Sequence, residues 1–173
     1  MLRELAHVLD RTYFSKADVS GFLSKLAATT ELTGDSPCDY WRRSNLLRIQ
    51  KHGASQLEIL ALFDDVLMSL CSTRTRQCGS PGGHFIYLDD VLFTGGRVGE
   101  DLSDWIINHA PTSSIVRIIT IATHTFGEYK VRGRLRDAAA AAGKTIEPSF
   151  WKTAAYENRL NWRNRSEVLW PID

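Results

Sequence analysis

The sequence contains few cysteines, and their spacing is irregular. Cys38, Cys71 and Cys78 are an odd set without a CxxC pair, so they do not outline a disulfide framework. Cys71, Cys78 and His84 would together make a poorly spaced zinc set. The simplest interpretation is a reduced cytoplasmic protein with unpaired thiols, because cytosolic thiols are rarely oxidised.

An excess of charge and a long apolar run are also lacking. The 173 residues carry 21 Lys+Arg against 20 Asp+Glu, a net charge of +1, so no whole-chain field attracts nucleic acid or a membrane. Charges occur already at Arg3 and Glu4, which excludes a secretory h-region. No apolar run approaches the roughly 20 residues of a membrane-spanning helix. These absences predict a cytoplasmic protein without membrane contact.

Residues 1–71 have the apolar periodicity of a helical N-terminal region that packs on a core. A first apolar face consists of Leu2, Leu5, Val8 and Leu9. Ser15 and Asp18 have the spacing of a capping box, which predicts that a helix begins there. Residues 40–50 have no clear period and are predicted to be a helix that leads into a short strand.

A longer helix is predicted from Gln56 to Cys71. Ser55 and Glu58 have capping-box spacing before an apolar stripe, which marks the beginning of a helix. The pair Asp64-Asp65 lies inside this segment. Because the period is helical and no glycine turn follows, we expect these two acids on a solvated face.

Residues 72–148 have the pattern of an α/β core. Strands are predicted in the apolar run that ends at Asp89, at 115–123 and at 144–147, with helices at 98–109 and 128–142. Glu100, Asp101 and Asp104 are expected on the solvent side of the first of these helices. Continuous apolar strands that alternate with helices predict an α/β fold with a doubly wound, mainly parallel sheet.

The most distinctive segment, residues 84–97, joins the first buried strand to a helix. Asp89 and Asp90 end the apolar run, and a Thr-Gly-Gly turn follows at 94–96. Glycines let the backbone turn sharply and approach a ligand, and a helix that begins there offers N–H groups and a positive dipole end to a phosphate. The carboxylates could accept hydrogen bonds from ribose hydroxyls or hold Mg²⁺ through water. The alternative is a plain strand–turn–helix connection with two solvated acids.

This segment resembles the phosphoribosyl-diphosphate loop of type I phosphoribosyltransferases, in which two acids after a strand precede Thr-Gly-Gly-Thr. The resemblance implies that Asp89 and Asp90 hold the ribose hydroxyls and are catalytic. It implies that the cradle of the 5-phosphate is lined by Phe93, Thr94, Gly95, Gly96 and Arg97. Mg²⁺ would be held through substrate and water rather than by direct protein ligands.

Arg97 departs from the family pattern, which has a hydroxyl residue at this position. An arginine could supply a charge-assisted fork to phosphate oxygens, or it could point into solvent and leave the cradle one donor short. A second departure is that no clear diphosphate-binding turn precedes the acid-pair strand. Sugar-phosphate binding is therefore better supported than catalysis.

Two other segments supply candidate site residues. Residues 72–83 are polar and glycine-rich, which predicts a mobile loop. By the resemblance, Arg74 and Arg76 would belong to the basic loop that closes over the diphosphate; the alternative is a disordered surface connection. His124 follows the second strand, where ligands collect in parallel sheets. It could contact the diphosphate or the acceptor, or it could be a structural hydrogen-bonding histidine.

Residues 149–173 are predicted to form a tail that interleaves aromatic and basic side chains. These are Trp151, Tyr156, Trp162 and Trp170 among Lys152, Arg159, Arg163 and Arg165. Such a segment could bind single-stranded nucleic acid, or it could dock on its own domain or on a protein partner; we favour docking. The apolar end at 169–172 leads us to expect a longer full-length protein.

Short motifs across most of the chain resemble a phosphoribosyltransferase-like family of bacterial conflict and phage-defence loci. The motifs are Tyr40-Trp41-Arg42-Arg43, Ile49-Gln50, Gly53-Ala54-Ser55-Gln56, the acid-pair turn and Ala122-Thr123-His124. This resemblance implies a ribose-phosphate ligand and a protein partner in a defence complex. Two functions stay open. One is an enzyme that transfers or cleaves the ribosyl group of phosphoribosyl diphosphate with Mg²⁺, and the other is an inactive sugar-phosphate sensor or scaffold.

Overall fold

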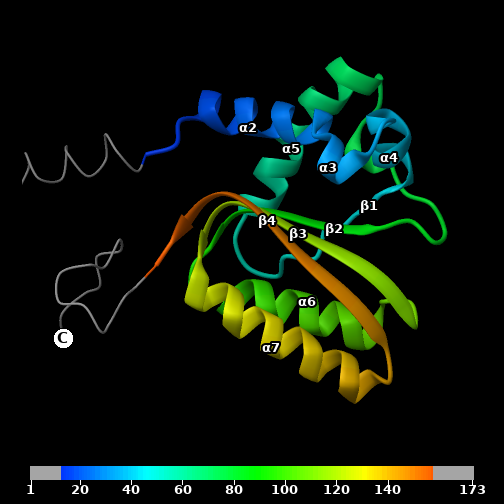
Figure 1. Cartoon of the computed structure of the whole chain (residues 1–173), viewed down its shortest axis with the longest axis vertical. Coiled ribbons are helices and arrows are strands. Elements are labelled where there is room, and N and C mark those ends of the chain that lie inside the picture. Colours follow the sequence, from blue (N-terminus) through cyan, green and yellow to red (C-terminus); the bar gives the residue numbers. More distant parts are fainter. Residues whose placement is uncertain (1–12, 158–173) are drawn as a thin grey trace, which may run out of the picture.

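The computed structural model describes residues 13–157, which form a four-stranded parallel sheet between two layers of helices (Figure 1). The strands are β1 (Asn45–Leu46), β2 (Phe85–Leu92), β3 (Ser113–His124) and β4 (Thr145–Tyr156), side by side in that order. One face is covered by α2 (Lys16–Ala28), α3 (Thr30–Thr33), α4 (Pro37–Arg43) and α5 (Ser55–Cys71), and the other by α6 (Gly96–Asn108) and α7 (Thr125–Ala142). The predicted doubly wound α/β fold with a helical N-terminal region is confirmed.

Each face of the sheet has its own hydrophobic core. Side chains alternate between the two faces of a strand, so Ile86 and Leu88 of β2 pack with α5, whereas Tyr87 packs with α6. β3 repeats this arrangement with Ile119 on the α5 side and Ile118 on the α6 side. Apolar residues on both faces are expected for a parallel sheet covered on both sides.

The two predicted capping boxes have different outcomes. Ser15 and Asp18 form the first as predicted: Asp18 N donates to Ser15 Oγ at 3.2 Å, and Ser15 N donates to Asp18 Oδ2 at 2.9 Å. The second prediction is wrong, because α5 begins at Ser55 without a side-chain cap. The Ser55 hydroxyl donates instead to Asp89 Oδ1 at 2.7 Å. A tertiary partner has replaced the local one.

Two acids predicted to face solvent are used inside the structure. Asp64 is half-buried, and its Oδ1 accepts a hydrogen bond from Thr75 N at 2.7 Å. Asp101 is buried and accepts from Lys51 N at 3.3 Å and from the Tyr87 hydroxyl at 3.2 Å. Helical periodicity gives no sign of such partners, because they are distant in sequence.

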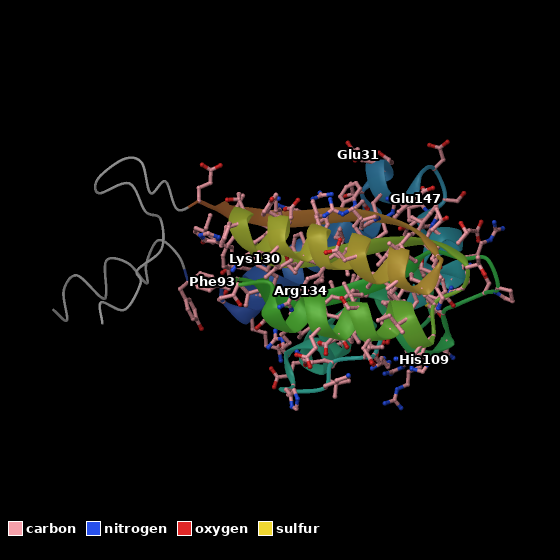
Figure 2. The ribbon with its side chains drawn as sticks, turned by 90° about the horizontal axis from the view of Figure 1, so that it is seen from below. Glu31, Phe93, His109, Lys130, Arg134 and Glu147 are labelled. Carbon is pink, nitrogen blue, oxygen red and sulfur yellow. A yellow bond between two sulfur atoms is a disulfide. The ribbon has the colours of Figure 1, made fainter. Side chains whose placement is uncertain are left out.

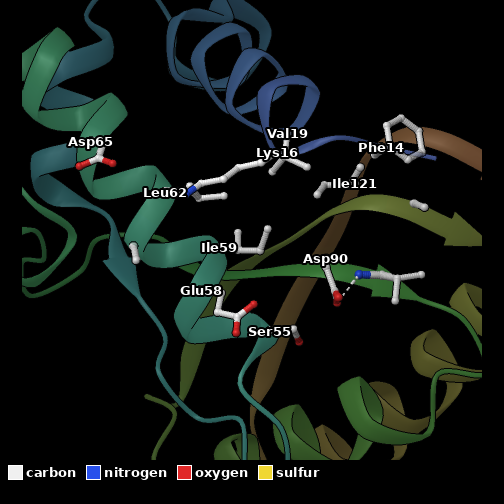
Figure 3. Close-up of a pocket in the computed structure, with 13 residues that line it drawn as sticks. Phe14, Lys16, Val19, Ser55, Glu58, Ile59, Leu62, Asp65, Asp90 and Ile121 are labelled. Atoms are coloured by element: carbon white, nitrogen blue, oxygen red, sulfur yellow. Dashed lines mark hydrogen bonds between the residues drawn. The ribbon is translucent and has the colours of Figure 1, made fainter.

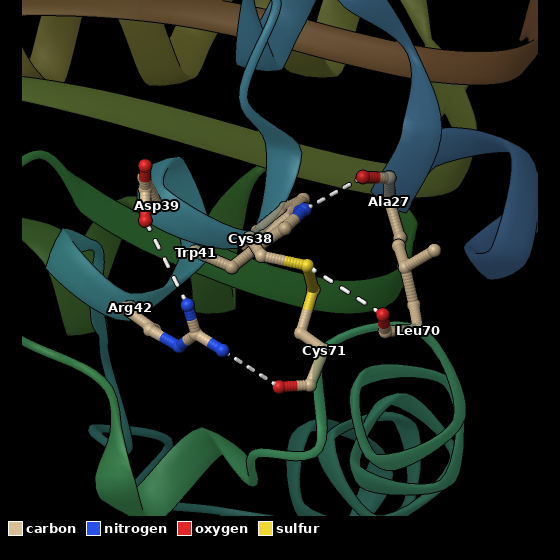
Figure 4. The surroundings of a disulfide bond; sticks show 7 residues. All are labelled: Ala27, Cys38, Asp39, Trp41, Arg42, Leu70 and Cys71. Carbon is tan, nitrogen blue, oxygen red and sulfur yellow. Dashed lines mark hydrogen bonds and ion pairs between the residues drawn. A yellow bond between two sulfur atoms is a disulfide. The ribbon is translucent and has the colours of Figure 1, made fainter.

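Cys38 in α4 and Cys71 at the end of α5 form a disulfide (Figure 4). The prediction of unpaired thiols is therefore wrong for these two residues; in the described part of the chain, only Cys78 is a free thiol. The cysteines are 33 residues apart, and only the packing of α4 beside α5 brings their Cα atoms to 5.3 Å. The described residues contain no cluster of three potential metal ligands, and Cys71 of the poorly spaced zinc set is bonded to Cys38.

Strand β4 is longer than the strand predicted at 144–147. It pairs with β3 from Ser113↔Thr145 to His124↔Tyr156, so the start of the predicted aromatic tail belongs to the sheet. The sequence hid this because β4 is an edge strand, with polar residues and Pro148, which edge strands tolerate. The rest of that tail and the apolar face at 2–9 lie outside the described residues. Within residues 13–157, no helix has the length and apolar character of a membrane span.

Candidate functional site

The candidate residues gather at the carboxyl edge of the sheet. Asp89 and Asp90 lie near the end of β2, and β3 ends at His124. Helices α5, α6 and α7 all begin at this edge, at Ser55, Gly96 and Thr125. Helix N-termini carry partial positive charge, and ligands of open parallel sheets bind beyond the carboxyl ends of the strands. The edge is therefore suited to an anionic ligand.

Strand alternation sends the two acids to opposite faces of the sheet. The Asp89 side chain is completely buried on the α6 side. Asp90 is 43% exposed and borders a cavity on the α5 side. Burial, and then the charge of Asp89, raise the pKa of Asp90. Only the second acid of the pair thus faces an open volume.

The Asp89 carboxylate is surrounded by donors from the protein itself. Its Oδ1 accepts from Ser55 Oγ at 2.7 Å and from Asp90 N at 2.9 Å. Its Oδ2 accepts from Arg97 Nη2 at 2.9 Å and lies 3.3 Å from the Tyr87 hydroxyl. A carboxylate has about four acceptor positions, so Asp89 has little capacity left for a ligand.

The Tyr87 hydroxyl links the acid pair to a third carboxylate. It lies between Asp89 Oδ2 and Asp101 Oδ2, and its single proton can serve only one of them at a time. Burial and the charges of Asp89 and Asp101 raise the pKa of Tyr87, so it stays protonated. Burial also raises the pKa of Asp101, although the hydrogen bond from Lys51 N opposes this.

Arg97 supplies the positive charge at the acid pair. Its Nη2 lies 2.9 Å from Asp89 Oδ2, 3.5 Å from Asp90 Oδ1 and 3.3 Å from Ser55 Oγ. The side chain therefore folds back from the first turn of α6 onto the acids, instead of pointing into solvent. Its Nε is buried without a hydrogen-bond partner. The arginine joins the phosphate turn to the acid pair.

The Thr-Gly-Gly turn forms a second, smaller hollow of about 200 Å³. It is lined by Val91, Phe93, Thr94, Gly95, Gly96, Arg97 and Val98, so the structure brings all the predicted cradle residues together. Gly95 has φ +74°, and a Cβ there would meet Gly127 O at 2.6 Å, which explains the glycine. The N–H groups of Arg97 and Val98 lie in the first turn of α6, where a helix supplies no acceptor.

A larger cavity of about 680 Å³ lies on the α5 side of Asp90 (Figure 3). Its lining is mostly apolar and consists of Phe14, Lys16, Val19, Ser55, Glu58, Ile59, Ala61, Leu62, Asp65, Asp90, Val91, Ile121 and Ala122. Asp90 and Ser55 lie at one end, and Lys16 extends along the opposite wall toward Leu62. Val91 borders both this cavity and the hollow over the turn.

The connection from β1 to α5 also reaches the site, although it was not among the predicted site segments. Gln50 Nε2 donates to Ser55 Oγ at 3.0 Å. A Cβ on Gly53 would lie 3.7 Å from Arg97 Nη1. This connection has the same order of strand, glycine turn and helix as the acid-pair segment. That order was the available signal, but β1 has only two residues and gave no apolar run to mark it.

The structure does not bring Arg74 and Arg76 to the acid pair. They flank the buried Thr75 in the 3₁₀ turn η1 (Thr75–Gln77). Together with Arg48, Leu57, Ala61 and Asp64, they line a separate hollow of about 420 Å³. The segment 72–83, predicted as a mobile loop, is docked by hydrogen bonds from Thr75 N to Asp64 and from Gly79 N to Arg42 O. None of its residues lines the cavity beside Asp90.

His124 lies at the edge and supports the turn. It is buried, and its Nδ1 accepts a hydrogen bond from Phe126 N at 3.2 Å, which caps α7. Its ring packs edge-on against Phe93, with centroids 5.5 Å apart. A direct contact between His124 and a ligand stays a prediction.

The fold and this edge define a phosphoribosyltransferase-like α/β protein, in which a parallel strand, an acid pair, a Thr-Gly-Gly turn and a helix follow one another. The family model PRTase-CE matches residues 1–173. The chain therefore belongs to the PRTase-CE family, which is phosphoribosyltransferase-like. A comparison with curated proteins gives no match.

Proposed function

We propose that the protein binds phosphoribosyl diphosphate or a related ribose 5-phosphate at this edge. The observation that carries the proposal is that the hollow over the Thr-Gly-Gly turn and the cavity beside Asp90 share Val91 as a lining residue, which we take as the junction of the two. A pentose at this junction would present its phosphate to the N-terminus of α6, which favours anions. Its hydroxyls would face the Asp90 carboxylate, which accepts hydrogen bonds.

The two acids have different roles in this proposal. Asp90 accepts hydrogen bonds from the ribose, because it is the acid that borders the cavity. Asp89 is a positioning residue: completely buried, it holds Arg97 and Ser55 through hydrogen bonds of 2.9 and 2.7 Å. Arg97 then reduces the repulsion between the acid pair and the ligand phosphate.

We propose that Mg²⁺ enters this site already bound to the phosphates of the ligand. Asp90 is the partly exposed carboxylate at the edge, and it would hold the ion through water, as Mg²⁺ usually keeps several waters. When bound, the ion would neutralise charge on the departing diphosphate. We place that group beside the β1–α5 connection, where Gly53 is close to Arg97. The mostly apolar cavity beyond Asp90 would hold the acceptor.

A second function, an inactive sensor or scaffold, is favoured by one specific observation. The Arg97–Asp89 pair satisfies the first acid within the protein, and the predicted basic loop is docked elsewhere. Such a site can retain a sugar phosphate without the groups that expel diphosphate. From the resemblance to defence-locus proteins, we further propose a cytoplasmic effector or accessory component that works with a protein partner.

Ligand binding is tested by calorimetry with phosphoribosyl diphosphate and Mg²⁺. Asp90→Asn should weaken binding about tenfold or more, because a charge-assisted hydrogen bond to the ribose is lost. Asp65→Asn is the matched control, since Asp65 lines the same cavity from α5; its affinity should be that of the wild type. Equal affinities for wild type and Asp90→Asn would refute the assignment.

Turnover separates the enzyme from the sensor. The wild-type protein is incubated with Mg²⁺, radiolabelled phosphoribosyl diphosphate and a set of nucleobases. Release of diphosphate above the rate without protein supports the enzyme. Retention of intact ligand without release supports the sensor.

A further inference from the structure

Three aromatic side chains are exposed around the Thr-Gly-Gly turn. Phe93 is 37% exposed, Phe126 54% and Tyr129 73%. Phe126 and Tyr129 lie in the first turns of α7, with their rings nearly parallel at 14° and their centroids 6.4 Å apart. Contiguous exposed apolar surface marks interaction sites, so this group of rings indicates a ligand that offers flat surfaces.

Close backbone packing fixes these rings beside the turn. A Cβ on Gly127 would meet Phe93 O at only 2.0 Å, so α7 touches the turn directly. Because Gly127 follows Phe126 in the chain, the packing places the Phe126 backbone next to Phe93. Phe93 itself lines the hollow in which we place the ligand phosphate, and the backbone of α7 lies directly against it.

Cations accompany the aromatic rings. Lys130 Nζ lies 4.5 Å from the centroid of Phe126, and Arg134 Nη1 donates to Gly96 O at 3.1 Å. Figure 2 shows Phe93 and Lys130 toward one end of α6 and α7, Arg134 further along α7, and His109 toward the other end. We call the three aromatic residues and the two cations together the aromatic platform: Phe93, Phe126, Tyr129, Lys130 and Arg134.

Glu128, the acid in the first turn of α7, does not cancel this positive charge. Glu128 is paired with Arg132 at 2.8 Å and with Lys152. Burial opposes its ionisation, but the hydrogen bonds from Lys152 and Arg132 outweigh burial and lower the pKa of Glu128. Glu128 is thus ionised and already neutralised by two cations, which leaves the charges of Lys130 and Arg134 available to an anion.

We infer that the aromatic platform binds single-stranded RNA. Bases stack on exposed aromatic rings whatever their sequence, and cations beside the rings neutralise the phosphates. A purely apolar partner would not explain Lys130 and Arg134 at the platform. RNA is favoured over DNA because the Asp90 carboxylate next to the turn can accept hydrogen bonds from ribose hydroxyls. The ribose phosphate at the turn would then be part of a strand, a step that rests on the proposed function.

Fluorescence anisotropy of the full chain with a labelled oligouridine of about ten nucleotides tests the inference. Phe126→Ala/Tyr129→Ala should weaken binding about tenfold or more, because each stacked base contributes roughly 1–3 kcal/mol. Ile107→Ala is the matched control: Ile107 is 49% exposed near the far end of α6, and its removal should leave binding unchanged. Phe126→Leu/Tyr129→Leu keeps apolar surface without the rings and should also bind weakly.

The salt dependence gives an independent measurement. Lys130→Gln should reduce the slope of log K against log salt concentration by about one, because one phosphate contact is lost. An unchanged slope together with an unchanged affinity in the aromatic variants would overturn the inference. So would a wild-type protein that does not bind the oligonucleotide.

Titration of ribose 5-phosphate into the same proteins separates the two proposals. If the wild type binds ribose 5-phosphate but not RNA, the platform is refuted and the proposed function stands. If it binds RNA through the platform but binds neither ribose 5-phosphate nor phosphoribosyl diphosphate with Mg²⁺, the proposed function fails and the RNA surface stands.

Discussion

The tetrapeptide Asp-Asp-Val-Leu occurs twice in this protein, at 64–67 in α5 and at 89–92 in β2. In the helix, Asp64 is half-buried against Thr75 N and Asp65 is exposed. In the strand, Asp89 is completely buried and Asp90 faces a cavity. The same residues thus form a surface feature in one place and the centre of the candidate site in the other.

The difference comes from backbone geometry and from the segment that comes next in the chain. Neighbouring side chains are about 100° apart around a helix but point to opposite faces of a strand. A strand therefore places one acid in the protein interior and the other at a cavity. After β2, the glycine turn begins a helix whose second residue, Arg97, returns to the acids; α5 simply continues beyond Asp65. The second acid of each copy lines the same 680 Å³ cavity, so Asp65 is a natural control for Asp90.

The largest expected effect is on stability, from removing the disulfide at the end of α5, the helix that carries residues 64–67. Cys38→Ser/Cys71→Ser should lower the free energy of unfolding by roughly 3–4 kcal/mol, because the disulfide closes a long loop in the unfolded chain. Urea unfolding measures this change, with Cys78→Ser as the control that keeps the disulfide. Equal urea midpoints for the oxidised and the reduced wild type would contradict the expectation.

The next largest effect on stability should distinguish Asp89 from Asp64, the first acids of the two Asp-Asp-Val-Leu segments. Asp89→Ala should lower the free energy of unfolding by about 3 kcal/mol, because it leaves Arg97 without its buried partner. Asp64→Ala removes one hydrogen bond to Thr75 N and should cost about 1 kcal/mol. Urea unfolding at neutral pH measures both. Removing Arg97 together with Asp89 should recover part of the loss in a double-mutant cycle; strictly additive losses would show that the pair is not coupled.

The smallest expected effect is on the pH dependence of Tm, and it should distinguish Asp90 from Asp65, the second acids of the two segments. The pKa of Asp90 is raised in the fold, so the folded protein holds this proton more tightly than the unfolded chain does. The stabilisation from this proton is complete below the ordinary aspartate pKa and is lost as pH rises through the raised value. Asp90→Asn should therefore raise Tm at pH 7, by less than the effects above, and the gain should shrink as pH falls.

Scanning calorimetry from pH 7 to pH 4 checks this expectation. Asp65→Asn, at an exposed position, should leave Tm nearly unchanged throughout. A gain for Asp90→Asn that grows toward acid pH would contradict the sign of the shift. Because the same variant should lose ligand, it would also show that binding is maintained at the expense of stability.

The sequence by itself determined the features that depend on local periodicity and backbone geometry. The apolar runs of β2 and β3 predicted buried parallel strands, the stripe of α5 predicted a helix, and the Thr-Gly-Gly turn predicted the beginning of another helix; all three are present. Each depends on residues that are neighbours in the chain. A period of two or 3.6 residues, or a glycine at a positive φ, is visible without knowledge of the fold.

Only the tertiary structure decided which groups those elements meet. The Ser55 hydroxyl bonds Asp89 instead of capping α5, and Arg97 pairs with the acids. Arg74 and Arg76 line a separate hollow away from the acid pair. Cys38 and Cys71 became bonded across 33 residues, and β4 extended along the edge of the sheet by pairing with β3. These outcomes depend on distances between residues far apart in sequence, and local propensity carries no information about such distances.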